Sequence, residues 1–206
     1  SAVALGFYRK AAEQGFARGQ HELAKSYQLG RGLASNLTEA AAWFRRAAEQ
    51  GFGLSQAALG FAYAGGRGVP VDYQQANSWF RKGIDQGVGD AAAGLGILYV
   101  AGLGVAADPV QGAQWLQRAA DQGSLIGQFE LAELYQSGRG VPRDLTQSAK
   151  LYKAAAEQGM RDAQYKLATL LLGVPGITRN EADAAGWFRK AADQGHLESQ
   201  VMLARM

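Results

Sequence analysis

The chain has 206 residues, 48% of them hydrophobic, with a formal net charge of +3 and no cysteine. The apolar content excludes wholesale disorder, and the lack of cysteine excludes a disulfide framework. The small charge is weaker than the basic excess of a dedicated nucleic-acid binder, and no run of about 18 apolar residues could span a membrane.

The N-terminal segment, residues 1–14, carries Ala4, Phe7 and Tyr8 at helical spacing. After it, the phrase Ala-Ala-Glu/Asp-Gln-Gly recurs with a period of 36 residues and no insertion. Its glycines are Gly15, Gly51, Gly87, Gly123, Gly159 and Gly195. We therefore expect one solenoid over 1–206: the second helix of a partial repeat (1–14), five full repeats (15–194) and a partial sixth (195–206).

Each repeat predicts a helix, a turn and a second helix. The first helix has an apolar stripe such as Leu59, Gly60 and Tyr63, and it ends at a Gly-x-Gly turn such as 66–68. The second helix begins after an Asn or Asp that can cap it, with an acidic or amide side chain three residues later. These pairs are Asn36/Glu39, Asp72/Gln75, Asp108/Gln111, Asp144/Gln147 and Asn180/Asp183. The prolines lie in the loops or, as Pro109, at the first helical position.

The pattern from Leu59-Gly60 through Asp72 to Trp79-Phe80 resembles the Sel1-like repeat family, a relative of the tetratricopeptide repeat. The resemblance implies an all-α fold, a right-handed superhelical solenoid of antiparallel helix pairs whose first helices line a concave groove. It also implies a scaffold or adaptor, commonly in the bacterial envelope or in host interaction, and it favours a periplasmic or secreted location. The fifth copy departs at Leu171, Val174 and Pro175, so we expect its loop to differ in shape.

No catalytic constellation is found, so the sequence predicts neither an enzyme nor a cofactor. His21 and His196 lie outside the repeated core positions and outside any His-Glu-x-x-His motif, and we expect both to be exposed. Glu130 and Glu133 share one helix face, which we interpret as solvated rather than as an acid–base pair. An alternative is that the chain is a regulatory or targeting module of a longer enzyme whose catalytic site lies elsewhere.

Basic pairs recur on the second helices, at Arg45-Arg46, Arg81-Lys82 and Arg189-Lys190. We interpret them as a solvated outer stripe; the alternative is contact with an anionic membrane or nucleic acid. Aromatic residues at the repeated positions are interpreted as core, which argues against a glycan-binding role.

The face of the first helices opposite the repeated Leu stripe predicts where a partner binds. In the central repeats this face is apolar, and an apolar patch with a polar rim is typical of an interaction site. The residues are Leu54, Phe61, Ile97, Val100, Ile126, Phe129 and Tyr165, with Lys25 and Glu133 as charged flanks. The expected partner is a protein or peptide; the alternative is that these side chains pack between adjacent repeats.

The chain stops inside a first helix with an apolar cluster of Val201, Met202, Leu203 and Met206. A cap should be polar at this place, so this end favours a segment of a longer array over a capped solenoid. We expect the bare face to promote end-to-end self-association.

Overall fold

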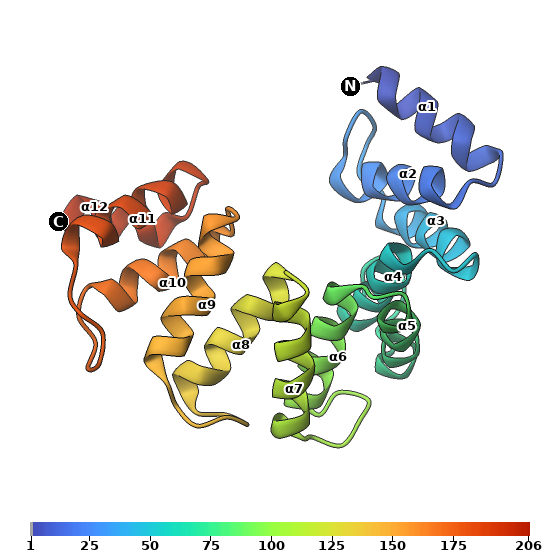
Figure 1. The fold of residues 1–206 in the computed structure, drawn as a ribbon. Coiled ribbons are helices and arrows are strands. Elements are labelled where there is room, and N and C mark those ends of the chain that lie inside the picture. Colours follow the sequence, from blue (N-terminus) through green and yellow to red (C-terminus); the bar gives the residue numbers. More distant parts are fainter. Residues whose placement is uncertain (1) are drawn as a thin grey trace. The chain divides into compact units, whose positions relative to one another are not determined.

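The computed structural model describes residues 2–206 and is built from helix pairs (Figure 1). In this part of the chain there are twelve helices and no strand. They are α1 (Ala2–Glu13), α2 (Ala17–Leu29), α3 (Leu37–Glu49), α4 (Gly53–Gly65), α5 (Tyr73–Asp85), α6 (Gly89–Ala101), α7 (Pro109–Asp121), α8 (Leu125–Ser137), α9 (Leu145–Glu157), α10 (Arg161–Leu171), α11 (Glu181–Asp193) and α12 (Leu197–Arg205). The all-α helix-pair solenoid predicted from the sequence is confirmed.

The chain forms two compact units, residues 1–108 with α1–α6 and residues 109–206 with α7–α12. Within each unit, every helix packs against its neighbours along the chain, and α4 also contacts α6. None of the described helices has the length and hydrophobicity that a membrane span requires.

Local chemistry sets the helix ends. The first helices α2, α4, α6 and α8 end at glycines in the left-handed conformation, where a side chain would be strained. The second helices α3, α5, α9 and α11 begin directly after the capping residues Asn36, Asp72, Asp144 and Asn180, and each cap accepts a hydrogen bond from the amide three residues later. These four predicted caps are confirmed, and α7 begins at Pro109 as expected.

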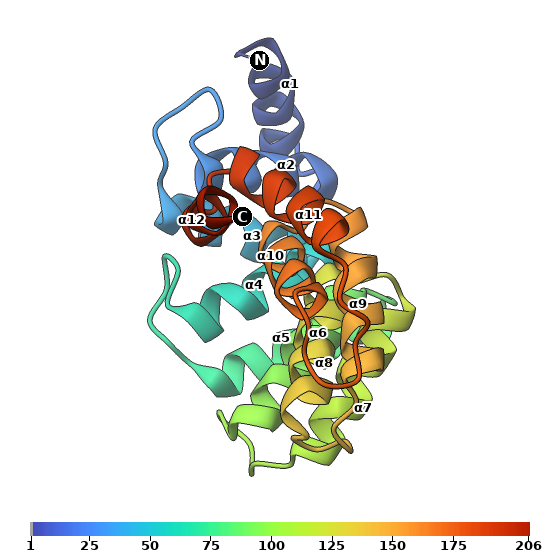
Figure 2. The same ribbon diagram turned by 90° about the vertical axis from the view of Figure 1, so that its left-hand side faces the viewer.

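The loops between paired helices project from the stack, as residues 30–36 and 66–72 show in Figure 2. Gly68, Gly104 and Gly140 pack so closely on the start of the preceding second helix that a Cβ atom would overlap it. The fifth loop differs, as predicted: α10 is two residues shorter than α8 and ends without a left-handed glycine. Gly176, the equivalent of Gly68, has no neighbour within 4 Å of a Cβ position.

The core combines buried leucines of the first helices, such as Leu59 and Leu95, with large side chains and alanines of the second helices. One repeated position on the second helix is buried in every full repeat: Phe44, Phe80, Leu116, Tyr152 and Phe188. Phe80 illustrates the packing, because its ring lies against Gly60 of α4 and Gly94 of α6. The absence of side chains at these glycines allows the helices to approach closely.

Candidate protein-binding surface

In the first unit, the predicted apolar strip lies on α4 and α6, and its members differ in exposure. Leu54 is 51% exposed, whereas Phe61, Ile97 and Val100 are half-buried. The Phe61 ring packs edge-on against the buried ring of Phe80, with centroids 4.9 Å apart. Lys25 is half-buried on α2 and lies 3.6 Å from the Glu22 carboxylate. Phe61 therefore contributes to packing within its repeat, and Leu54 is the most exposed of the four apolar side chains.

In the second unit, the predicted residues lie on α8 and α10 and are all half-buried: Ile126, Phe129, Glu133 and Tyr165. The Phe129 ring lies 5.6 Å from that of Tyr152, and the Tyr165 ring lies 5.8 Å from that of Phe188. Tyr165 also stacks on the imidazole of His196 at 4.5 Å. These aromatic rings thus have protein partners on one side and expose only part of their surface.

Neighbouring helices cover a first helix over a wider angle than its Leu stripe predicts. Ala57 and Ala93 lie four residues before Phe61 and Ile97, on the same helix face, and are 3% and 0% exposed. In a solenoid a first helix meets both its own partner and the elements of the preceding repeat, as α4 meets α3 and α5. Two contact faces leave a narrower strip for solvent than the single Leu stripe indicates.

The prediction that His21 is exposed is wrong. Its side chain is 7% exposed, with ring centroids 5.4 Å from Phe44 and 5.2 Å from Phe52. Its Nδ1 lies 2.8 Å from the Ser55 Oγ. Desolvation by burial lowers the pKa of His21, and the nearby Glu22 carboxylate opposes this shift. The ring therefore belongs to the packed junction between two repeats.

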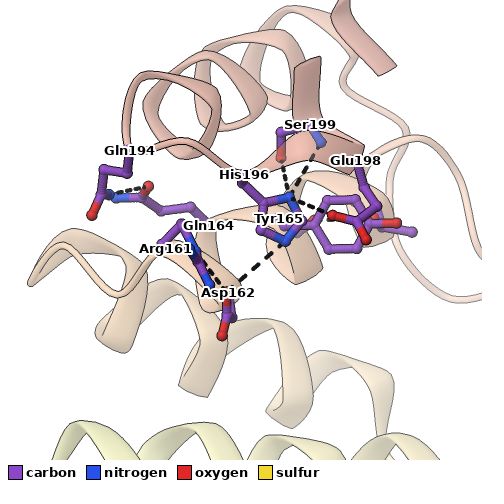
Figure 3. Close-up of polar contacts among 9 residues, drawn as sticks. Arg161, Asp162, Gln164, Tyr165, Gln194, His196, Glu198 and Ser199 are labelled. Atoms are coloured by element: carbon purple, nitrogen blue, oxygen red, sulfur yellow. Dashed lines mark hydrogen bonds and ion pairs between the residues drawn. The ribbon is translucent and has the colours of Figure 1, made fainter. Parts of the chain in front are cut away.

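The exposure predicted for His196 is also wrong, because its side chain is only 12% exposed. Figure 3 shows its contacts with Ser199, Asp162 and Glu198. Nδ1 accepts a hydrogen bond from the Ser199 amide at 3.2 Å and so caps α12. The Ser199 Oγ lies 3.0 Å from Nδ1, and an Asp162 oxygen lies 3.9 Å from Nε2. This places a serine, a histidine and a carboxylate together, but Ser199 is 0% exposed and has no access to a substrate.

A polar network in the second unit was not predicted. Glu133 pairs with Lys166 at 2.8 Å and accepts a hydrogen bond from the buried hydroxyl of Tyr152, which also lies 3.0 Å from the Gln136 Oε1. Burial raises the pKa of Tyr152, and the hydrogen bond to Glu133 adds to the shift. Burial, with repulsion from Glu133, also raises the pKa of Glu130. Glu130 and Glu133 are thus half-buried, not a fully solvated face.

The basic pairs on the second helices have two distinct contacts. In two of the three pairs the first member reaches the next first helix: Arg45 donates to the Tyr63 hydroxyl at 2.6 Å, and Arg81 donates to the Tyr99 hydroxyl at 3.1 Å. The second member lies over a half-buried tryptophan of its own helix, as Lys82 lies over Trp79. Among the described residues, no cluster of three or more His, Asp or Glu side chains is arranged to hold a metal ion.

This succession of helix pairs, with left-handed glycines and side-chain caps at the helix ends, defines an α-helical repeat protein. The sequence profile of the Sel1 repeat matches residues 2–16, 17–52, 53–88, 89–124, 125–160 and 161–196. The chain therefore belongs to the Sel1 repeat family. Proteins of this family are generally non-catalytic scaffolds for protein interaction.

Solved structures of similar proteins come from several bacteria. A Sel1 repeat protein from Oxalobacter formigenes is 34% identical over 92% of this chain and 76% of that chain, with a TM-score of 0.83. A protective antigen of uropathogenic Escherichia coli strains is 38% identical over 99% of this chain, with a TM-score of 0.69. This chain covers 44% of the length of that antigen. A comparison with curated protein sequences gives no match.

An immunity protein from Pseudomonas aeruginosa has the same fold at 20% identity, with a TM-score of 0.66 over 92% of this chain and 72% of that chain. At this identity the similarity extends to the fold alone.

Proposed function

We propose that this chain is a scaffold that binds a partner peptide or helix along the accessible strip of its first helices. The observation that carries the proposal is the exposure of Leu54 on α4, since an exposed leucine offers apolar surface to a partner. The half-buried side chains of Phe61, Ile97 and Val100 extend this apolar strip. An apolar surface of this kind suits an apolar segment of a partner, and Lys25 supplies a charged flank.

The second unit offers an equivalent strip on α8 and α10. Ile126 and the open edges of Phe129 and Tyr165 supply apolar surface, and Glu133 supplies a carboxylate at its side. We propose this strip as a second part of the binding surface. The similarity to the protective antigen of uropathogenic E. coli supports a bacterial envelope or host-interaction context.

The test is a peptide-display screen with the full chain, run in parallel on Leu54→Asp. The matched control is Val110→Asp, because Val110 is 57% exposed and lies on α7, a second helix. The proposal predicts ligands that bind the parent and the control but not Leu54→Asp, with all three proteins folded by circular dichroism. Equal binding to all three folded proteins would contradict it.

A further inference from the structure

Four second helices repeat one pairing of an indole ring with a cation three residues later. The four pairs are Trp43 with Arg46, Trp79 with Lys82, Trp115 with Arg118, and Trp187 with Lys190. The cationic atom lies 3.9 to 5.5 Å from the ring centroid in these pairs. Each ring is half-buried, so the pair covers the flank of its repeat.

Helix α9 lacks both members of this pairing. Leu151 stands at the tryptophan position and Ala154 at the position of the cation. Both residues line a hollow of about 270 Å³ in the second unit. Ala120 and Asp121 of α7, Gln128 of α8 and Lys150 of α9 also line it, together with Gln117 and Gln147. The hollow therefore lies at the place where the smaller side chains replace a ring and its cation.

A cation is nevertheless present beside this hollow. Lys150 is exposed and lies four residues before Ala154, on the same face of α9. The equivalent residues of the other repeats are the uncharged Ala42, Ser78, Gln114 and Gly186. Within the described part of the chain, the Lys150 ammonium has no ion pair, whereas its neighbour Lys153 pairs with Glu157. This repeat thus has a cation without a ring.

We propose that this hollow, on the second-helix side of the second unit, binds the indole ring of a tryptophan presented by a partner protein. The ring would contact Leu151, Ala154 and Ala120, and the Lys150 ammonium would lie over its face. The Asp121 carboxylate at the rim is an acceptor for the indole N–H, which favours tryptophan over phenylalanine. This hollow is separate from the apolar strip on the first helices. A failure of indole binding here would therefore not contradict peptide binding along the strip, and the converse also holds.

The test uses amide NMR spectra of the full ¹⁵N-labelled chain during titration with N-acetyl-tryptophanamide. N-acetyl-leucinamide is the matched probe without a ring. We expect saturable shifts centred on Leu151, Ala154 and Ala120 with the first probe, and much weaker binding of the second. Shifts spread over the chain, or equal binding of the two probes, would overturn the proposal.

Three variants identify the site. Leu151→Trp combined with Ala154→Lys recreates the pairing of the other repeats and fills the hollow, so we expect it to abolish the saturable shifts. Lys150→Gln should weaken binding about two- to fivefold, the effect of losing one exposed cation–π contact. Lys153→Gln, on the same helix but outside the hollow, should leave binding unchanged.

Unchanged binding in the filled variant would overturn the proposal, as would equal effects of the two lysine variants. If the double variant does not fold, Ala154→Leu is the alternative, because it narrows the hollow with a single change. It should likewise abolish the saturable shifts.

Discussion

The Nδ1 atom of His21 lies 2.8 Å from the hydroxyl oxygen of Ser55, so the imidazole links α2 to α4 of the following repeat. Both side chains are buried, and the imidazole packs against the rings of Phe44 and Phe52. A titratable group has thereby become part of the junction between repeats. The stability of this junction should depend on pH near neutrality.

The free energy of unfolding should fall as the pH drops below 6.5. Burial lowers the pKa of His21 in the folded protein below the 6.5 of the unfolded chain, so the unfolded state binds the proton first. The stability is therefore fully present above pH 6.5, and it falls between 6.5 and the lower folded pKa by up to about 1.4 kcal/mol per pH unit. Urea denaturation between pH 8 and about pH 5 measures this loss.

The control for this prediction is His21→Phe combined with Ser55→Ala, which gives the residues found at the equivalent positions three repeats later, Phe129 and Ala163. It removes the titrating group and leaves no unpaired hydroxyl, so the pH dependence above about pH 5 should flatten. His196→Asn keeps a capping acceptor at the start of α12. It should not change the dependence of the unfolding free energy on pH that is due to His21. If the unfolding free energy of the double variant still fell with pH as in the parent, the pH dependence could not be assigned to His21.

Gly94→Ala should destabilise the first unit, although alanine normally favours a helix over glycine by about 1 kcal/mol. A methyl group at Gly94 would overlap the buried ring of Phe80, which gives an expected net loss of about 1–3 kcal/mol. Gly186 is the matched control, because it lies in α11 with nothing within 4 Å of its Cβ position. Gly186→Ala should therefore stabilise, and chemical denaturation should show opposite signs for the two variants.

Tyr152→Phe should lower stability by about 1 kcal/mol, although phenylalanine occupies this position in three other repeats. The change removes a hydroxyl that donates to Glu133 and leaves the half-buried carboxylate with Lys166 alone. Phe80→Tyr is the converse control, because Phe61 of α4 takes the place of Glu133 and offers no acceptor. Both variants should lower the urea midpoint, and a stabilising effect of either would contradict this account.

The local features of each repeat were predictable from the sequence. The Asn and Asp caps and the left-handed glycines depend on neighbouring residues and on dihedral angles that few side chains permit. The altered fifth loop was predictable for the same reason, because Leu171, Val174 and Pro175 break the turn pattern.

The solvent-exposed face of a first helix could not be predicted from such local patterns. Periodicity identifies one buried stripe, but the burial of His21 and Ala93 depends on a second contact from a neighbouring repeat. The Tyr152–Glu133–Lys166 network joins three helices through residues 14 or more positions apart, so no local pattern indicates it. A half-buried aromatic ring such as Phe61 is equally compatible with a binding strip and with core.

An aspartate at Phe61 and one at Leu54 should therefore have very different effects on folding. Phe61 packs on Phe80, so Phe61→Asp places a charge against a buried ring and should cost several kcal/mol, about 3 or more. Leu54 is 51% exposed, so Leu54→Asp should change stability by less than about 1 kcal/mol. Thermal unfolding followed by circular dichroism measures both. Equal and small losses would place the whole strip in solvent, whereas equal and large losses would place Leu54 in the core and remove the surface on which the proposed peptide binds.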